Sequence, residues 1–200
     1  MRIVAIMGSY RKGHAVDRLV DEAIAGAVSS GDVHVDKITL VDRSIGYCRN
    51  CLSCRDNPTD ADYAHCVIRD DMDEIVPLLA EADAFIFGTA VAIGTVTAVM
   101  KTFLDRTVWL FAKPGRWPLK GCPTPRARRR RHAVILLASG TVPPIIRFVC
   151  DDATKVVRDV CEEALGAKVI GSLYAGAIER RGLERYLPKA RSLGAKLVSP

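Results

Sequence analysis

The sequence predicts an α/β fold in which a doubly wound parallel sheet carries helices on both faces. Apolar runs flanked by turn residues alternate along the chain with segments of helical period. The length of 200 residues suits one domain. A composition of 49% hydrophobic and 26% charged residues is ordinary for a globular protein. We therefore expect a single domain over 1–200, large enough to fold without a metal or a disulfide.

The strands are expected at short apolar runs, which in a parallel sheet are buried on both faces. The chain begins with such a run, so we interpret its amino terminus as a strand rather than a signal segment. No apolar run approaches the ~20 residues needed to cross a bilayer, and a cytoplasmic protein without membrane contact is expected. The five predicted strands are 2–7, 33–40, 84–88, 133–138 and 168–174.

Helical segments separate the predicted strands. The first repeats apolar residues at i, i+3, i+4, i+7 and i+8, which puts them on one face of a helix, against the sheet. The second has the capping-box spacing of Asp71 and Glu74, while Pro77 inside it moves the expected start to about Asp73. The stripe of the first helix is Val16, Leu19, Val20, Ala23, Ile24, Ala27 and Val28.

Three further helices follow in the second half of the chain. Thr95 is the expected N-cap of the third helix. Asp151 or Asp152 is the expected N-cap of the fourth, which ends at Gly166. A last helix is expected around 186–197, where apolar residues again recur with helical spacing.

Two long stretches carry no predicted element: a cysteine-rich insertion at 44–70 and a basic loop at 112–132. Loops longer than about 15 residues in a compact domain are usually functional or mobile. The basic loop contains the arginine run 126–131, which supplies much of the net charge of +6. No aromatic residues interleave with these arginines, so we interpret the run as a solvated loop and expect no nucleic-acid partner.

Ligands of open parallel sheets bind beyond the carboxyl ends of the strands, where the winding direction reverses. The loop after the first strand leads directly into a helix, whose first backbone N–H groups are free to bind an anion. The loop also carries two cations and a hydroxyl, so it suits a phosphate. The loop lacks the G-x-G-x-x-G pattern, and we identify no acidic partner for a ribose, which favours a mononucleotide. The predicted phosphate-binding residues are Ser9, Arg11, Lys12, Gly13, His14, Ala15 and Val16.

Two more loops are expected at the same edge of the sheet. The loop after the third strand is rich in small residues, which would let a flat ring lie close to backbone amides. A small, flexible turn follows the fourth strand. The predicted ring-binding residues are Thr89, Ala90, Val91, Ala92, Ile93 and Gly94, with Ser139 and Gly140 in the turn.

Three motifs together resemble the NADPH-dependent FMN reductase and iron-sulfur flavoprotein family. They are Gly8-Ser9-x-Arg11-x-Gly13, Cys66-Val67-Ile68-Arg69-Asp70-Asp71-Met72, and Gly94-x-x-x-Ala98-x-x-Lys101-x-Phe103-x-Asp105-Arg106. The resemblance implies a flavodoxin-like, five-stranded sheet of order 2-1-3-4-5. It also implies that the cofactor is FMN, with its phosphate at the first loop and its isoalloxazine at 89–94. Finally, it implies that the chain forms dimers or tetramers. The flavin would carry the chemistry, so no catalytic side chain is expected.

The chain departs from the family pattern at four positions. Ala15 and Val16 stand where members usually carry Asn and Thr. Ala90 and Ala92 stand where proline and tyrosine are usual, which removes an aromatic wall. The expected phosphate contacts therefore come from backbone N–H groups and from Ser9, Arg11 or Lys12.

The insertion carries four cysteines, the ligand number of a [4Fe-4S] cluster: Cys48, Cys51, Cys54 and Cys66. In iron-sulfur flavoproteins the fourth cysteine follows more closely, and many similar reductases keep the cysteines without a cluster. Three roles stay open, namely a cluster, a zinc or redox-active thiol site, and reduced cysteines without a ligand. A disulfide framework is not expected in a reducing compartment.

The leading hypothesis is an NAD(P)H-dependent FMN oxidoreductase that passes electrons to a flavin, a quinone, a metal ion or a protein acceptor. The first alternative is an electron carrier in which a cluster on the four cysteines delivers single electrons to FMN. The second is a flavin-less regulator or nucleic-acid-binding protein that uses the arginine run.

An aromatic segment joins the third helix to the basic loop. Trp109, Leu110 and Phe111 lead into Pro114 and Trp117, which we expect beside the ring loop. Aromatic anchors are enriched in interface cores, and large apolar patches are rarely left exposed. We hypothesise that these residues pack across a subunit interface, so that loop 112–132 of one subunit covers the flavin of another.

Overall fold

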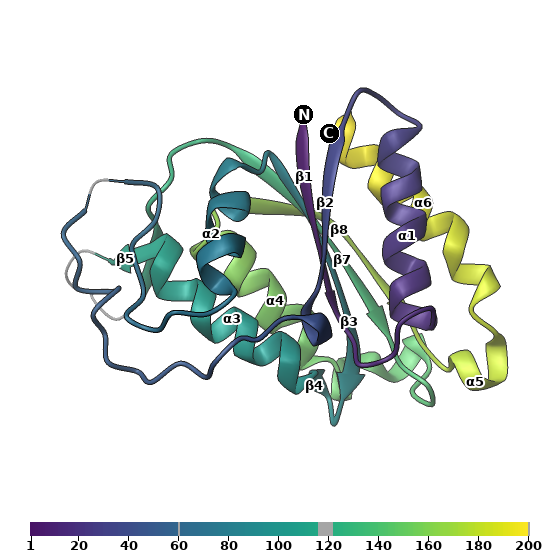
Figure 1. The fold of residues 1–200 in the computed structure, drawn as a ribbon. Coiled ribbons are helices and arrows are strands. Elements are labelled where there is room, and N and C mark those ends of the chain that lie inside the picture. Colours follow the sequence, from purple (N-terminus) through teal and green to yellow (C-terminus); the bar gives the residue numbers. More distant parts are fainter. Residues whose placement is uncertain (60, 116–121, 200) are drawn as a thin grey trace.

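A computed structural model describes residues 1–59, 61–115 and 122–199, in which five parallel strands form the central sheet (Figure 1). The order β2-β1-β3-β7-β8 confirms the predicted order 2-1-3-4-5, because β7 and β8 are the fourth and fifth predicted strands. The neighbouring strands pair in parallel throughout. They are β1 (Arg2–Gly8), β2 (His34–Thr39), β3 (Ala84–Ala92), β7 (Arg131–Ala138) and β8 (Ala167–Ala175).

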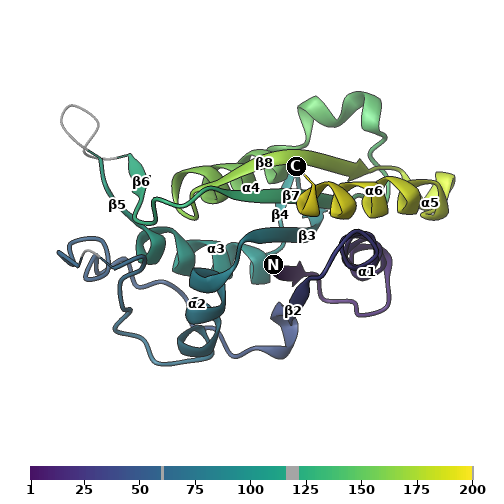
Figure 2. The ribbon, with the colours of Figure 1, turned by 90° about the horizontal axis from the view of Figure 1, so that it is seen from above.

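Helices cover both faces of the sheet, which gives the three layers seen in Figure 2. Strand β1 shows why both faces are apolar: Val4 and Ile6 belong to one buried cluster, and Ile3, Ala5 and Met7 belong to the other. One face carries α1 (Ala15–Val28) and α6 (Leu187–Val198), and the other carries α2 (Met72–Glu81), α3 (Ala98–Phe111) and α4 (Asp152–Glu163).

Glycines set the close approach of α1 and α6. A Cβ placed on Gly26 would lie 2.0 Å from the Arg191 carbonyl oxygen, and one placed on Gly194 would lie 1.8 Å from the Ala23 carbonyl oxygen. Neither distance is sterically possible, so a larger residue at either position would push the two helices apart.

Two of the predicted helix starts have opposite outcomes. Asp151 caps α4 as predicted, because its carboxylate accepts a hydrogen bond from the Thr154 N–H at 2.9 Å. The Asp71 capping box is wrong: Asp71 has helical backbone angles, and its carboxylate accepts from the Ser44 N–H at 2.9 Å instead. Helix α2 therefore begins at Met72, without a side-chain cap.

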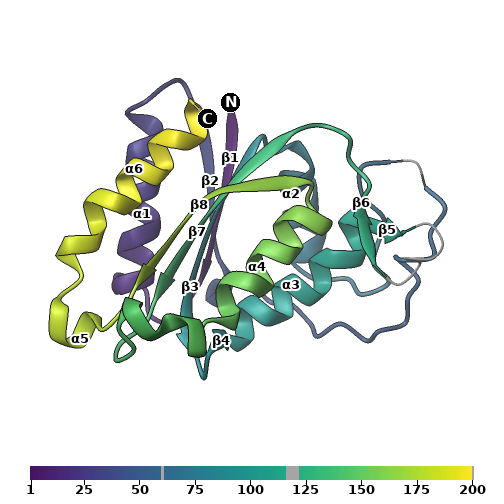
Figure 3. The same ribbon diagram turned by 180° about the vertical axis from the view of Figure 1, so that it is seen from behind.

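The insertion starts at the carboxyl edge of the sheet, where Ile45 and Tyr47 lie beside the first turn of α3. Its later part lies with the basic loop at the far end of α3 (Figure 3). Part of the basic loop forms an antiparallel pair, β5 (Ala112–Pro114) and β6 (Pro123–Pro125), where the sequence indicated no strand. The described part of 44–70 contains turns but no helix or strand. Within the described residues, none of the helices combines the length and apolar character that a membrane crossing demands.

The arginine run is solvated only in its middle, where Arg128, Arg129 and Arg130 are exposed, so the predicted solvated loop is wrong at both ends. Arg126 is buried and donates to the carbonyl oxygens of Ala112 and Cys54. Arg131 is buried and donates to the carbonyl oxygens of Ala80 and Leu165, at the carboxyl ends of α2 and α4. Burial lowers the pKa of Arg131 to about 10, so it is still a cation at neutral pH, where helix carboxyl ends favour one.

The aromatic segment also lies elsewhere than predicted. Leu110 and Phe111 are 1% exposed and belong to the core of their own chain, so they do not pack across an interface. Trp109 is partly buried, with the Arg55 guanidinium 5.9 Å from its ring centroid. Trp117 lies outside the described residues, and the segment is separated from the ring loop by the length of α3, roughly 20 Å.

Candidate functional site

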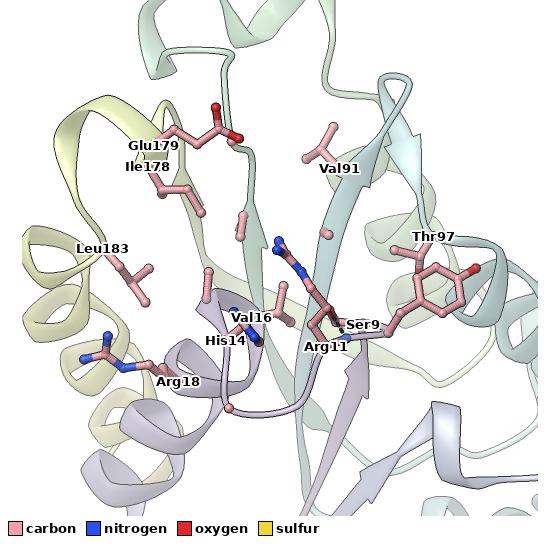
Figure 4. A pocket seen from close by; sticks show the side chains of 16 residues that line it. Ser9, Arg11, His14, Val16, Arg18, Val91, Thr97, Ile178, Glu179 and Leu183 are labelled. Atoms are coloured by element: carbon pink, nitrogen blue, oxygen red, sulfur yellow. Dashed lines mark hydrogen bonds between the residues drawn. The ribbon is translucent and has the colours of Figure 1, made fainter.

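A cleft of about 680 Å³ opens at the carboxyl edge of the sheet (Figure 4). It lies beside β1 and β3, between which the direction of winding reverses. Its volume is within the range of small-molecule and cofactor sites, roughly 300 to 1,000 Å³. The predicted residues that line it are Ser9, Arg11, Gly13, His14, Ala15, Val16, Ala90, Val91 and Gly140.

The amino end of α1 forms the floor of the cleft. Gly13 adopts φ +73°, and its N–H donates to the Asp17 carboxylate at 2.6 Å, which fixes the turn into the helix. The N–H groups of Ala15 and Val16 belong to the first turn, where a helix offers them no acceptor. These N–H groups and the helix dipole suit an anion, although the side chains are apolar.

Asp17 stabilises this turn as a carboxylate. Burial alone would raise its pKa, but the hydrogen bond from the Gly13 N–H and the Lys37 ammonium at 2.5 Å outweigh that effect. The pKa of Asp17 is therefore below its ordinary value. The turn is thus held by a charged group at neutral pH, and Asp17 itself does not line the cleft.

The two cations of the loop point in different directions. The Arg11 side chain extends into the cleft, toward Val91 and Ile178 (Figure 4). Lys12 does not line the cleft, because its ammonium pairs with Asp42 at 2.8 Å on the exposed side. The Ser9 hydroxyl accepts the Arg11 N–H at 3.3 Å, which shapes the loop. Arg11 is thus the cation that can contact a phosphate.

The ring loop is a β-hairpin. Strand β3 continues to Ala92 and pairs with the two-residue strand β4 (Thr95–Val96), so that Ile93 and Gly94 form the turn with φ of 49° and 78°. Ala90 and Val91 line the cleft, whereas the hairpin tip projects beyond it. Predicted residues that do not line the cleft are Thr89, Ala92, Ile93, Gly94, Ser139 and Lys12.

The hairpin moves the cap of α3 by two residues. Thr95 belongs to β4, so the predicted cap is wrong, and the Thr97 hydroxyl accepts the Met100 N–H instead. The same hydroxyl donates to the Gly8 carbonyl oxygen at 2.7 Å. Buried Thr89 donates to that carbonyl as well, at 3.2 Å. Thr97 and Thr89 thus join the ends of β1, β3 and α3 beneath the cleft.

The far wall of the cleft comes from the segment after β8, which the sequence analysis missed. Helix α5 (Ile178–Arg181) follows its N-cap residue Ala177, and the Glu179 N–H donates to the Gly140 carbonyl oxygen at 3.2 Å. The topology alone could have indicated this wall, because every parallel strand ends at this edge. The missed lining residues are Tyr10, Arg18, Thr97, Ala138, Ile178, Glu179 and Leu183.

The cysteine-rich insertion is held by buried arginines. Arg106 of α3 pairs with Asp70 at 2.5 Å and donates to the Gly46 carbonyl oxygen at 2.8 Å, which closes the neck of the insertion. Arg126 donates to carbonyl oxygens farther along the insertion, including that of Thr59 at 3.2 Å. Neither arginine is near the cleft at the carboxyl edge, so this is a second, separate region.

The four cysteines do not form a metal site as they stand in the described chain, where no three His, Cys, Asp or Glu side chains could hold an ion together. Cys48 and Cys51 are exposed, whereas Cys54 and Cys66 are half-buried. Burial, followed by the charge of Cys66, raises the pKa of the Cys54 thiol. The arrangement seen therefore does not fit a bound cluster.

The fold is flavodoxin-like, and its cleft lies at the amino end of the first helix. The chain belongs to the NADPH-dependent FMN reductase family, whose model matches residues 1–178.

Comparison with individual proteins agrees with this family. An iron-sulfur flavoprotein of Archaeoglobus fulgidus is 39% identical over 106 residues, which cover 53% of this chain and 45% of that protein. An iron-sulfur flavoprotein of Methanosarcina thermophila is 34% identical over 113 residues, 56% of each chain. This chain thus spans about half the length of these relatives.

Among solved structures, the NAD(P)H:quinone oxidoreductase from Methanothermobacter marburgensis shares the fold. The two structures superpose with a TM-score of 0.69, the two sequences are 16% identical, and the comparison covers 98% of each chain.

Proposed function

We propose that the protein is an NAD(P)H-dependent oxidoreductase that binds FMN in the cleft at the carboxyl edge. The observation that carries the proposal is the amino end of α1, which presents its first-turn N–H groups and Arg11 to a cavity of about 680 Å³. When bound, FMN would accept a hydride from NAD(P)H and pass two electrons on to a second substrate.

The residues present fit FMN in two parts of the cleft. The N–H groups of Ala15 and Val16, with the Arg11 guanidinium, would hold the phosphate. The strand end at Ala90 and Val91 and the turn at Gly140 would hold the ring. Small side chains there let a planar ring approach the backbone closely.

The electron acceptor is proposed by class only: a flavin, a quinone, a metal ion or a protein. The cleft supports an organic, planar acceptor best, because the lining near Val91, Ala138 and Ile178 is apolar. Glu179 is the only acid that lines the cleft in the described part of the chain, so no acidic cluster at this cleft favours a metal ion.

The test is purification followed by a visible absorbance spectrum and mass spectrometry of the released ligand. We expect FMN to co-purify or to be loadable, and NAD(P)H to bleach its absorbance. FAD as the released ligand, or no binding at high added FMN, would overturn the proposal, because the loop offers a cradle for one phosphate.

A second candidate function is an electron carrier with a [4Fe-4S] cluster on the insertion. The four thiols on one loop favour it, as do two relatives named iron-sulfur flavoprotein. The positions of the cysteines disfavour it, because in the described residues no three of them lie close enough together to bind one metal ion. Iron and acid-labile sulfide analysis of protein purified without oxygen separates the two: about four of each per chain requires the cluster, whereas none leaves the first proposal alone.

A further inference from the structure

A second cavity, of about 380 Å³, lies at the edge of the sheet opposite the cleft, where β7 and β8 begin (Figure 3). We call it the amino-edge cavity. Its volume is within the range of small-molecule sites. Strand β7 spans eight residues from Arg131 to Ala138 of the cleft, so roughly 23 Å separate the two cavities. The residues that line the amino-edge cavity are Arg130, Arg131, His132, Gly166 and Lys168.

Four of these five residues are basic, and the strand register sets them on both faces of the sheet. His132 of β7 pairs with Lys168 of β8, so their side chains leave the same face side by side. The Arg131 guanidinium lies on the other face, 5.9 Å from the Phe85 ring centroid. Arg130 directly precedes β7 and is exposed. The cavity is therefore surrounded by basic groups from the starts of two strands.

The outer basic groups of the amino-edge cavity are not neutralised by acidic side chains. Within residues 1–59, 61–115 and 122–199, none of Arg130, His132 and Lys168 forms an ion pair. By contrast Arg129, the neighbour of Arg130, pairs with Asp83 at 3.6 Å. An anion that enters the cavity would thus not have to displace a carboxylate from these three groups.

Buried Arg131 adds a charge that no carboxylate of the described chain pairs with. Its hydrogen-bond acceptors are carbonyl oxygens at the ends of α2 and α4, and its Nε has no partner among the described residues. Carbonyl dipoles stabilise a cation but leave its net charge in place. The charges of Asp62 and Asp83 act on Arg131, but neither carboxylate lines the cavity. The amino-edge cavity therefore keeps a positive potential.

The chemistry of these groups favours a phosphate. An arginine offers a planar fork of donors, a lysine offers a compact ammonium, and a histidine ring offers an N–H donor, so the three can contact different oxygen atoms of one tetrahedral group. In the described chain no aromatic side chain lines the cavity, so a nucleobase would have nothing to stack on. We propose that the amino-edge cavity binds a small phosphorylated anion with two or more negative charges. This site is separate from the proposed FMN cleft and does not depend on it.

Lysine footprinting on the full chain tests this site. Sulfo-NHS acetate acylates exposed, uncharged amines, and mass spectrometry of the digested chain measures each lysine separately. Inorganic pyrophosphate is the probe. We expect it to slow the acylation of Lys168 by about fivefold or more, because a bound anion covers the ammonium and favours its charged form. Lys189 is the matched control, because it is exposed on α6 and does not line the cavity.

Three substitutions locate the site. Arg130→Ala should raise the pyrophosphate concentration that half-protects Lys168 by about tenfold, since it removes a charge-assisted contact. Arg128→Ala is its matched control, because Arg128 is exposed in the same loop but lines a different cavity, and it should change that concentration less than about twofold. Arg11→Ala should leave the protection of Lys168 unchanged, which distinguishes this site from the proposed phosphate position at α1.

No protection of Lys168 at about 10 millimolar pyrophosphate overturns the proposal, and this measurement needs no variant to fold. Equal slowing at Lys168 and Lys189, or the same slowing in sodium chloride of equal ionic strength, overturns it as well, because general screening would then explain the effect. Equal effects of Arg130→Ala and Arg128→Ala overturn it for the same reason. Protection by a single-stranded oligonucleotide but not by pyrophosphate overturns it too and would assign the surface to nucleic acid.

Discussion

At the scale of single residues, Arg11 and Lys12 are adjacent cations with different surroundings, which makes them a matched pair. Arg11 faces the cleft, whereas Lys12 is bound to Asp42 on the outside. Charge-assisted contacts to a phosphate are worth about 1.5 to 3 kcal/mol, so Arg11→Ala should weaken FMN binding about tenfold or more. Lys12→Ala should weaken it less than about threefold. Titration of FMN fluorescence measures both.

Equal losses from the two substitutions would mean that general electrostatics, not the loop geometry, holds the anion. Arg129→Ala extends the comparison to the opposite edge of the sheet, where Arg129 pairs with Asp83 at 3.6 Å. It should leave FMN affinity unchanged.

The Asp70–Arg106 pair gives a second residue-scale prediction. Its side chains are 9% and 1% exposed, and removing one partner leaves a buried charge uncompensated. Asp70→Asn should therefore lower the free energy of unfolding by about 3 to 5 kcal/mol at pH 7, measured by urea denaturation. Asp73→Asn is the control, because Asp73 forms only an exposed pair with Arg69, and it should cost less than about 1 kcal/mol.

The effect of Asp70→Asn should depend on pH in a defined direction. Burial alone raises the pKa of Asp70, but the Arg106 guanidinium and the N–H groups of Gly46 and Met72 lower it below its ordinary value. Its contribution is then complete above the unfolded-state pKa of about 3.9 and is lost as pH falls through the folded-state pKa. The difference between wild type and variant should be constant from pH 5 to 8 and shrink below about pH 4. A difference that grew toward acid would contradict this account.

At the scale of elements, Thr97 joins the start of α3 to the end of β1. Thr97→Ala removes the helix cap and the hydrogen bond to the Gly8 carbonyl oxygen. It should therefore lower the free energy of unfolding by about 1 to 2 kcal/mol. Thr95→Ala should stay within about 0.5 kcal/mol, because Thr95 is exposed in β4 and caps nothing. Thermal denaturation of both variants compares them, and the reverse ranking would restore Thr95 as the cap.

These two threonines show where sequence reasoning reaches its limit. Strand β1 and the parallel sheet follow from apolar runs and helical stripes, whereas the order of the strands followed from the family resemblance. The choice between Thr95 and Thr97 does not, because both residues can cap a helix. It was decided by the Ile93-Gly94 turn, where a β-branched residue adopts a positive φ that local preference disfavours.

The buried arginines and α5 escaped prediction for related reasons. Arginine is normally exposed, and the carbonyl oxygens that satisfy Arg126 and Arg131 belong to distant elements that only the folded chain brings near. Helix α5 is four residues long and follows Ala177, which adopts φ 53°, so no periodic signal marks it. The first loop was correctly placed beside the cleft, because a strand that leads directly into a helix brings it there, whereas its binding of a phosphate stays a prediction.

At the scale of the whole molecule, cofactor binding should raise the stability of the fold. A ligand that binds only the folded chain stabilises it by about 2.7 kcal/mol at a free concentration 100 times its Kd. For a chain of this size, that corresponds to an increase in Tm of roughly 5 to 11 °C. Differential scanning calorimetry with added FMN measures the increase.

Riboflavin separates the two parts of the proposed site, because it carries the same ring without the phosphate. If the α1 floor and Arg11 hold the phosphate, riboflavin at the same total concentration should raise the Tm far less than FMN does. Arg11→Ala should reduce the FMN effect toward that of riboflavin, whereas it should leave the riboflavin effect unchanged. An equal increase with both ligands would place the binding energy in the ring wall, at Ala90, Val91 and Gly140, and would remove the phosphate cradle from the account of the site.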